Sequence, residues 1–247
     1  MPENASDLIL ECHAVGKTYG GLKAVSGVDI AAKRGEILGI IGPNGAGKTT
    51  LFNIISGHTS ATTGRIVFNG VDVTRRPAHA RARIGMGRTF QIVRPIRSLT
   101  VLENVMIGAF HAYPTREKAA RRALEVLERV ELIDRARSMA GELTLAGRKR
   151  LEVARALAGD TQLLLLDEVM AGLNPVEANQ AIAMIRRLGD AGTSVILIEH
   201  NLKVVNELAK HVVVLDHGAE IAQGKPGDVL KDPAVVEAYL GNRKVAR

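Results

Sequence analysis

Residues 42–50 have the residue types and spacing of a loop that binds phosphate. Two glycines, Gly42 and Gly47, are separated by four residues and followed by Lys48 and Thr49. In such loops consecutive backbone N–H groups surround the phosphates, and the lysine reaches the β- and γ-phosphate oxygens. The sequence therefore predicts a nucleotide-binding loop made of Gly42, Pro43, Asn44, Gly45, Ala46, Gly47, Lys48, Thr49 and Thr50.

A second stretch with residues suited to chemistry is an apolar run followed directly by two carboxylates. Residues 163–166 are four leucines, which predict a parallel strand buried on both faces, and Asp167 and Glu168 come directly after them. Ligands bind at the carboxyl ends of such strands. In a phosphate-loop protein the aspartate can hold Mg²⁺ through water, and the glutamate can orient or deprotonate an attacking water. Capping of a following helix is the alternative role for either side chain.

The segments around these residues predict the elements that position them. The apolar run 36–41 predicts a strand before the phosphate loop, and residues 50–56 predict a helix after it, whose N-terminus faces the bound anion. Another apolar run, 193–198, predicts a strand, so that His200 lies just past its carboxyl end. Pro175 is expected to begin a helix between the strand at residues 163–166 and the strand at residues 193–198.

The N-terminal part predicts antiparallel strands. Residues 8–15 and 25–32 are expected to pair through a glycine turn, which places Tyr19 on or near a loop. An exposed aromatic there can stack on a purine or simply pack against its neighbours. Asn69-Gly70 predicts a second hairpin. Gln91 ends an extended segment and by itself is typical of a surface glutamine.

The middle of the chain has helical periodicity instead. One apolar stripe recurs at intervals of three and four residues with charged residues opposite, and it consists of Ala119, Ala120, Ala123, Leu124, Leu127 and Val130. A second stripe covers residues 151–158. We therefore expect a block of helices inserted between strand regions.

The composition limits the possible functions. The chain has 247 residues, 46% of them hydrophobic, but no apolar run near the roughly eighteen residues of a membrane span and no signal peptide, so we expect a cytoplasmic protein. Its one cysteine, Cys12, excludes an internal disulfide and a four-ligand metal site. The net charge of +7 could attract nucleic acid, anionic lipid or an acidic protein, but it is spread over the predicted helices. With four phenylalanines, three tyrosines and no tryptophan to stack on bases, we expect no nucleic-acid partner.

In their order along the chain these motifs resemble the ATP-binding-cassette (ABC) ATPases over essentially the full length. The resemblance implies ATP and Mg²⁺ as cofactors and assigns a role to each motif. Lys48 and Thr50 would contact phosphate, and Tyr19 would stack on adenine. Thr49 and Asp167 would bind Mg²⁺. Gln91, which follows a Thr-Phe pair, would touch Mg²⁺ or the attacking water and sense the transporter, Glu168 would be the catalytic carboxylate, and His200 would contact the γ-phosphate.

The chain departs from the family at the signature segment, which we define as residues 143–147. The family sequence is usually Leu-Ser-Gly-Gly-Gln, whereas this chain has Leu-Thr-Leu-Ala-Gly. The resemblance implies that this segment binds the ATP of the opposite subunit through the hydroxyl of Thr144 and the N–H of Ala146 at a helix N-terminus. Leu145 adds bulk, and the amide of the usual glutamine is missing. Without the resemblance, these residues are a linker and a helix cap. Val169 stands where proline is common, and residues 171–174 read Ala-Gly-Leu-Asn in place of Ser-Ala-Leu-Asp.

Four stretches resemble more narrowly the ATPase subunits of branched-chain amino-acid importers: residues 143–157, 171–175, 198–205 and 227–241. This resemblance implies an ATP-hydrolysing subunit at the cytoplasmic face of the inner (plasma) membrane. It would be held there by two transmembrane permease subunits and paired with a second ABC ATPase, identical or different, and a solute-binding protein would act with it indirectly. The solute itself is not readable, because the ATPase never contacts it.

Other functions stay open at this point. An importer ATPase for another amino acid, an amide or urea has the same motifs. A non-transport ABC-type ATPase in DNA maintenance or translation would resemble tandem cassettes or cassettes split by a long coiled coil, and neither occurs. A GTP switch would carry an Asn-Lys-x-Asp motif after the phosphate loop, and none follows.

The expected fold is an α/β P-loop NTPase core of the ABC type, with an N-terminal antiparallel β region and an inserted helical subdomain. We expect a single ABC ATPase domain over residues 1–247. Within it, residues 1–91 and 160–247 would form the nucleotide-binding core with its β subdomain, and residues 92–159 the helical subdomain that carries the signature segment.

Overall fold

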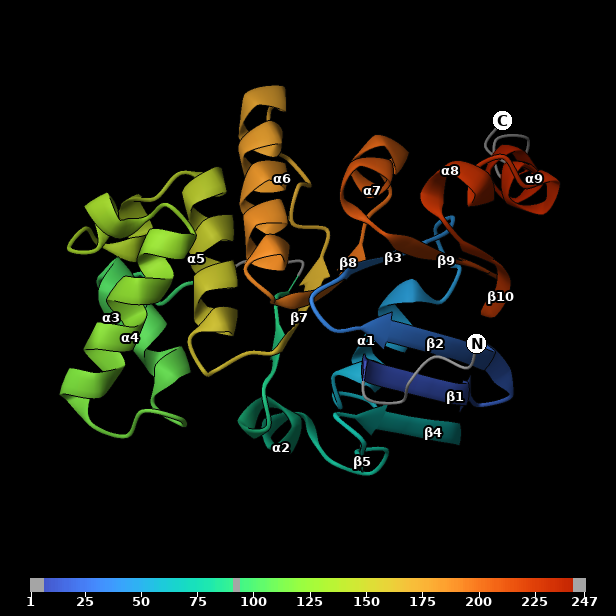
Figure 1. Cartoon of the computed structure of the whole chain (residues 1–247), viewed down its shortest axis with the longest axis horizontal. Coiled ribbons are helices and arrows are strands. Elements are labelled where there is room, and N and C mark those ends of the chain that lie inside the picture. The colour runs from blue at the N-terminus through green and yellow to red at the C-terminus, as the bar shows by residue number, and fades with distance from the viewer. Residues whose placement is uncertain (1–6, 91–93, 242–247) are drawn as a thin grey trace. The chain divides into compact units, whose positions relative to one another are not determined.

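The computed structural model describes residues 7–90 and 94–241 (Figure 1). The chain forms two compact units. We call residues 1–81 and 194–247 the loop unit, because it contains the phosphate loop, and residues 82–193 the inserted unit. The inserted unit is larger than the predicted helical subdomain of residues 92–159, whose bounds stay a prediction.

An antiparallel sheet forms one part of the loop unit. It contains β1 (Leu8–Tyr19), β2 (Leu22–Lys33), β4 (Thr63–Phe68) and β5 (Val71–Asp72), in the order β2-β1-β4-β5. The turn between β4 and β5 is Asn69-Gly70, with φ values of 51° and 73°. Asparagine and glycine tolerate this left-handed backbone, which matches the twist of a hairpin. Both predicted hairpins are therefore confirmed.

The second part of the loop unit is built on parallel strands. β3 (Ile37–Ile41) lies between β8 (Ser194–Ile198) and β9 (His211–Asp216) and runs parallel to both, while β10 (Ala219–Gly224) pairs antiparallel with β9. Every residue of β3 and β8 is buried, which explains their uninterrupted apolar sequences. The predicted strands before the phosphate loop and before His200 are confirmed.

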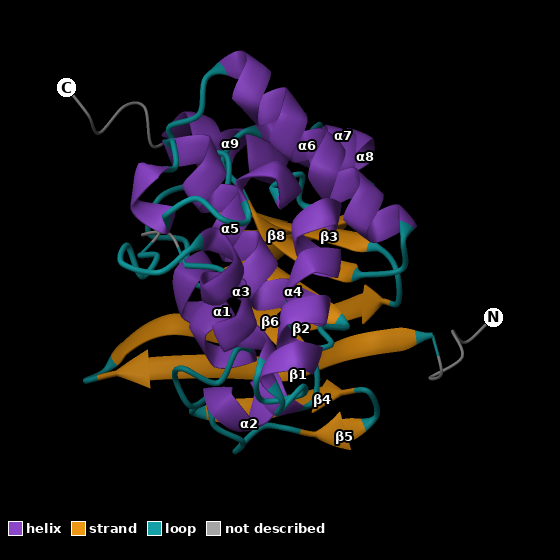
Figure 2. Cartoon of the chain, turned by 90° about the vertical axis from the view of Figure 1, so that its left-hand side faces the viewer, coloured by secondary structure: helices purple, strands orange, loops and turns teal. Residues whose placement is uncertain are grey.

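Helices complete the loop unit. α1 (Lys48–Ile55) follows the phosphate loop, and α7 (Leu202–Leu208), α8 (Pro226–Val229) and α9 (Pro233–Gly241) lie on the side of β3, β9 and β10 away from the antiparallel sheet (Figures 1 and 2). A cluster of buried side chains joins these helices to the strands, among them Ile41, Val205, Val214, Val229 and Val235. This cluster fixes the strand that leads into the phosphate loop.

The inserted unit pairs two short parallel strands, β6 (Met86–Arg88) and β7 (Leu163–Asp167). Its helices are α3 (Val101–Ala109), α4 (Arg116–Arg129), α5 (Leu145–Leu157) and α6 (Pro175–Asp190), with 3₁₀ turns at Ile133–Arg135 and Ala140–Glu142. α2 (Ala78–Arg83) spans the boundary of the two units.

Polar caps define where the long helices begin. The side chains of Thr100, Thr115, Thr144 and Asn174 each accept a backbone N–H from the first turn of the helix that follows. α6 begins at Pro175 as predicted, and Asn174 and Glu177 complete a reciprocal capping box there. The helical periodicity of the middle region is therefore confirmed.

Two positions in the predicted apolar stripe of α4 are exceptions, because Ala120 is only partly buried and Leu124 is exposed. Ala119, Ala123, Leu127 and Val130 are fully buried, but Leu124 is 39% exposed. Leu124 is at the edge of the stripe, where the helix surface turns toward solvent.

In the described residues, no helix combines the length and the apolar character needed to cross a membrane.

Candidate functional site: a phosphate loop and a carboxylate strand

The phosphate loop joins β3 to α1, as its sequence predicts. A Cβ atom at Gly42 would overlap the carbonyl oxygen of Leu215, and one at Gly47 would lie 2.5 Å from the carbonyl oxygen of Ala24. Both glycines also have positive φ, at 149° and 96°. Only glycine fits at these two positions, because close backbone neighbours and the left-handed conformation each exclude a side chain.

Lys48 holds its ammonium group over the start of this loop. Its side chain is buried, and its Nζ donates to the carbonyl oxygens of Gly42 and Pro43 at 2.7 and 2.8 Å. The same residue is the first of α1, so the ammonium and the N-terminal N–H groups of the helix belong to one segment. A buried cation beside a helix N-terminus is suited to bind the phosphate groups of a nucleotide.

The other end of α1 is held by a residue that sequence analysis missed. Arg81 is 1% exposed, and its guanidinium donates to the carbonyl oxygens of Ile54 and Ile55, at 2.8 and 2.6 Å, which end α1. It also donates to the carbonyl oxygens of Arg76 and Thr74. Cations near a helix C-terminus satisfy its unpaired carbonyls and oppose its dipole. Arg81 therefore fixes the helix that carries Lys48.

The C-terminal helix contacts the strand that precedes the loop. Tyr239 of α9 packs against the buried cluster that contains Ile41, the residue before Gly42. Burial raises the pKa of Tyr239, and the N–H of Gly42 opposes that rise. Its hydroxyl nevertheless makes no hydrogen bond of normal geometry to the described residues. We therefore treat Tyr239 as a packing contact beside the loop.

Two further predicted residues lie in the loop unit. Tyr19 ends β1 with 47% of its surface exposed, and the Nζ of Lys17 lies 5.0 Å from the centre of its ring. The exposed ring leaves a face open to a ligand, so stacking on adenine stays a prediction. His200 is exposed just after β8, and its contact with the γ-phosphate also stays a prediction.

The carboxylate strand lies in the inserted unit. Asp167 is the last residue of β7 and is buried, and its backbone N–H donates to the hydroxyl of Thr89 at 3.1 Å. Nη2 of Arg88 lies 3.6 Å from its Oδ2. Burial lowers the pKa of Arg88, and the Asp167 carboxylate opposes that change. Arg88 is a second functional candidate that the sequence did not reveal, because it resembles any other surface arginine.

Thr49 in the loop unit and Asp167 in the inserted unit each carry an oxygen atom of the kind that Mg²⁺ binds. Mg²⁺ in nucleotide sites takes one or two protein oxygens and completes its shell with phosphate oxygens and water. Among residues 7–90 and 94–241 no cluster of three or more His, Cys, Asp or Glu could hold a metal by itself. The oxygen chemistry of Asp167 and of Thr49, each taken by itself, fits Mg²⁺, and the metal stays a prediction.

Glu168 has an unusual backbone conformation. Its φ is 48°, a left-handed value that costs a residue other than glycine about 1–2 kcal/mol. Its carbonyl oxygen accepts hydrogen bonds from the N–H of Ala171 and from Nζ of Lys149, each at 3.1 Å. Such strain persists where the surroundings determine the conformation, and it is concentrated at functional sites.

Gln91 lies outside the described residues, so its role stays a prediction. The residue before it, Phe90, donates its backbone N–H to Oε1 of Glu152 at 2.7 Å. Burial raises the pKa of Glu152, and this hydrogen bond opposes the change. The segment that leads to Gln91 is therefore bound to α5.

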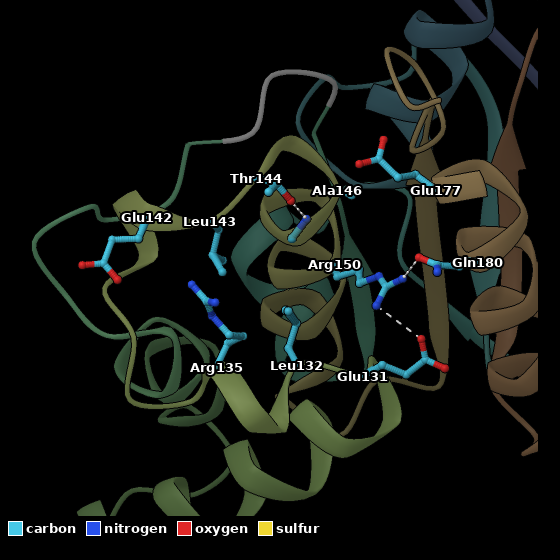
Figure 3. Close-up of a pocket in the computed structure, with 11 residues that line it drawn as sticks. Glu131, Leu132, Arg135, Glu142, Leu143, Thr144, Ala146, Arg150, Glu177 and Gln180 are labelled. Atoms are coloured by element: carbon cyan, nitrogen blue, oxygen red, sulfur yellow. Dashed lines mark hydrogen bonds and ion pairs between the residues drawn. The ribbon is translucent and has the colours of Figure 1, made fainter. Parts of the chain in front are cut away.

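A cavity of about 320 Å³ lies beside the signature segment (Figure 3). Thr144 caps α5 by accepting the N–H of Gly147 at 3.2 Å. Arg150 points toward Glu131 and Gln180, with an ion pair of 3.3 Å and a hydrogen bond of 2.8 Å (Figure 3). The full lining is Glu131, Leu132, Arg135, Glu142, Leu143, Thr144, Ala146, Gly147, Arg150, Glu177 and Gln180.

Two departures from the family sequence fit each other. A Cβ atom at Gly172, where the family usually has alanine, would lie only 3.1 Å from Cδ2 of Leu145. Leu145 stands where the family has a signature glycine. The larger side chain in the signature segment is therefore accommodated by a glycine in the loop after Glu168.

Comparisons with known proteins agree with this arrangement. Residues 25–171 match the family model described as ABC transporter, and residues 220–245 match the model described as branched-chain amino acid ATP-binding cassette transporter. The chain is 39% identical to a probable branched-chain amino acid transport ATP-binding protein LivG of Archaeoglobus fulgidus, over 94% of this chain and 95% of the relative. It is 38% identical to the high-affinity branched-chain amino acid transport ATP-binding protein BraF of Pseudomonas aeruginosa, over 94% and 98%.

Solved structures give the same result. The ADP conformation of MJ1267, an ATP-binding cassette of an ABC transporter, is similar at a TM-score of 0.87 and 33% identity, covering 95% of this chain and 99% of that one. The dimeric structure of MJ0796, a bacterial ABC transporter cassette, is similar at a TM-score of 0.77 and 26% identity, covering 88% and 98%. These matches confirm the predicted fold class and both resemblances found in the sequence. The chain belongs to the ABC transporter family and is one of its ATP-binding cassettes.

Proposed function

We propose that this chain is the ATP-hydrolysing subunit of a membrane importer for branched-chain amino acids. The phosphate loop carries the proposal, because two positions admit only glycine and the buried Lys48 ammonium lies against the loop backbone. The C-terminal match at residues 220–245 and the names of the relatives support the solute class.

The roles of the loop-unit residues follow from their chemistry. The N–H groups of the phosphate loop, which every residue from 42 to 50 except Pro43 carries, bind the β- and γ-phosphates together with the Lys48 ammonium, and Thr50 adds a further phosphate contact. Tyr19 stacks on the adenine ring, and His200 donates a hydrogen bond to the γ-phosphate. These contacts neutralise charge on the phosphoryl group that is transferred.

The remaining site residues complete the reaction, with Thr49 in the loop unit and Asp167 and Glu168 in the inserted unit. The Thr49 hydroxyl and the Asp167 carboxylate would each offer an oxygen to Mg²⁺, which would supply positive charge that stabilises the phosphate groups of ATP. Glu168 accepts a hydrogen bond from the attacking water, orients it and takes its proton as the oxygen bonds to the γ-phosphorus, and ADP departs. Gln91 contacts the metal or that water.

The assembly requires a second cassette and a permease. Thr144 and Ala146 present a hydroxyl and an N–H at the start of α5 to the ATP that the second ABC ATPase holds. Two transmembrane permease subunits hold the pair at the cytoplasmic face of the membrane, and a solute-binding protein delivers the solute to them. No nucleic acid takes part.

Glu168→Gln tests the reaction. Because the amide cannot accept the proton, steady-state hydrolysis should fall by about 100-fold or more, whereas ATP affinity should stay near the wild-type value. Lys48→Ala is the matched comparison, because loss of the ammonium should weaken ATP binding itself. Near-normal turnover in Glu168→Gln, or unchanged ATP affinity in Lys48→Ala, would remove that residue from its proposed role.

The transport role has a separate test. The tagged Glu168→Gln chain is expressed in its native cell, membranes are extracted gently with ATP present, and co-purifying proteins are identified. We expect two multi-span permeases and a cassette partner, and their solute-binding protein should bind leucine, isoleucine or valine by calorimetry. Recovery of soluble proteins or nucleic acid alone would contradict the importer. Binding of a different amino acid, an amide or urea would contradict only the solute.

A further inference from the structure

A buried lysine of α5 is bonded to the backbone of the proposed catalytic residue. Lys149 is 8% exposed, and its Nζ donates to the carbonyl oxygen of Glu168 at 3.1 Å. The hollow beside its stem is largely apolar, with Val153, Val169, Leu173 and Met184 in the lining. A charged group is costly to bury without polar partners, and the Glu168 carbonyl is one such partner of the Lys149 ammonium.

The bond is made where the chain is strained. Glu168 has a left-handed backbone at φ 48°, and its carbonyl also accepts the N–H of Ala171. Two donors therefore hold the peptide group that follows Glu168. Since φ and ψ of a residue determine the direction of its Cα–Cβ bond, fixing this peptide fixes the base of the Glu168 side chain.

The lysine belongs to a helix with two other functional contacts. α5 begins at the Thr144 cap, and Glu152, one turn after Lys149, accepts the N–H of Phe90. One rigid helix thus links the signature segment to the backbone of Glu168 and to the residue before Gln91. All of these contacts lie within the inserted unit.

We infer that Lys149 is a positioning residue for hydrolysis: its ammonium fixes the carbonyl of Glu168 and thereby holds the carboxylate in the orientation that aligns the attacking water. This inference rests on the proposed function of Glu168. The ammonium of Lys149 and the carbonyl that it holds both lie in the inserted unit, whereas the phosphate loop belongs to the loop unit, so we expect the effect on the chemical step and not on ATP binding.

Lys149→Met tests the inference, because methionine keeps an apolar stem of similar length and removes the donor. A misplaced catalytic group loses about 10- to 100-fold in rate, so kcat should fall by that factor while KM for ATP changes less than about twofold. Lys149→Arg keeps a cationic donor and should recover most of kcat. Arg155→Met is the matched control, because Arg155 is another basic residue of α5 that donates to a backbone carbonyl, that of Arg94 at 3.3 Å. Its basal kcat should equal that of the wild type.

A double mutant separates positioning from general damage. If Lys149 acts through Glu168, adding Lys149→Met to Glu168→Gln should cause no further loss of single-turnover hydrolysis of radiolabelled ATP. Any of three results would overturn the inference. Lys149→Met could reduce hydrolysis equally in the wild type and in Glu168→Gln, it could leave kcat unchanged, or it could raise KM alone. If Lys149→Met does not fold, Lys149→Gln replaces it, with a smaller loss of kcat and the same comparisons.

Failure of the inference is distinguishable from failure of the proposed function. If the wild-type chain hydrolyses ATP, Glu168→Gln is inactive and Lys149→Met is fully active, only the role of Lys149 is refuted. If Glu168→Gln hydrolyses ATP at the wild-type rate, the proposed role of Glu168 is refuted, and the inference with it.

Discussion

Arg81→Ala should destabilise the folded chain by about 4 kcal/mol, because the substitution removes a buried cation that is bonded to four carbonyl oxygens. The acceptors are the carbonyls of Ile54, Ile55, Thr74 and Arg76, at 2.8, 2.6, 3.1 and 2.8 Å. Two of these acceptors end the helix of the phosphate loop, so the loss is concentrated behind the nucleotide site.

The magnitude comes from two contributions that both destabilise the variant. A hydrogen bond to a charged group contributes about 1.5–3 kcal/mol, and a buried carbonyl left without a donor costs about 1–3 kcal/mol. These values do not add fully, because water can enter the space and burying the guanidinium has its own cost. Burial lowers the pKa of Arg81 to about 10, so the cation is intact at neutral pH. A net loss near 4 kcal/mol is a large part of the stability of a domain.

Urea unfolding followed by far-ultraviolet circular dichroism measures this loss, since the chain has no tryptophan to report by fluorescence. Arg75→Ala removes an exposed arginine three residues before α2 and should change the unfolding free energy by less than about 0.5 kcal/mol. Arg81→Lys should be intermediate, because an ammonium cannot reach all four acceptors. A loss below about 1 kcal/mol in Arg81→Ala, with an unchanged slope, would refute the reasoning.

Two further predictions concern the loop unit. Burial raises the pKa of the Cys12 thiol from 9.0 to about 12, so the stability due to burying the neutral thiol is complete below pH 9 and is lost as the pH rises toward 12. Between pH 9 and 10.5 the unfolding free energy of the wild type, measured with urea, should therefore fall by up to about 1.4 kcal/mol per pH unit more than that of Cys12→Ala. If the unfolding free energies of the two proteins change in parallel with pH, the prediction is contradicted. Gly42→Ala should lower the affinity for a fluorescent ATP analogue by about 100-fold or abolish it, because its Cβ would overlap the Leu215 carbonyl. Gly227→Ala, at a position with open space and ordinary φ, should bind like the wild type, and equal affinity of the two variants would disprove the steric argument.

Much of the fold follows from local sequence patterns. Four consecutive leucines indicate a strand buried on both faces, Asn-Gly fits the left-handed turn of a hairpin, and Pro175 after Asn174 begins a helix. Each of these signals acts through the backbone preferences of a few neighbouring residues. For the same reason the phosphate loop is readable from its own glycines and lysine.

The supporting contacts of the site were not predictable in this way. Arg81 lies among several arginines of a basic stretch, and Lys149 lies between two more, so neither differs in the sequence from a solvated surface charge. The structure brings Arg81 to the end of α1, Arg88 to Asp167 and Lys149 to the carbonyl of Glu168. Likewise, the exposure of Leu124 depends on which neighbouring elements cover α4.

Local sequence patterns predict the helices and strands, the phosphate-binding chemistry and the family. Periodicity and turn residues encode which face of an element is apolar and where the element ends, because these depend on backbone geometry within a few residues. Which charged side chains are buried, and which carbonyls they hold, becomes visible once the chain is folded. Those choices depend on contacts between segments distant in the chain, and the free energy of a charge is determined by the partners and solvent around it.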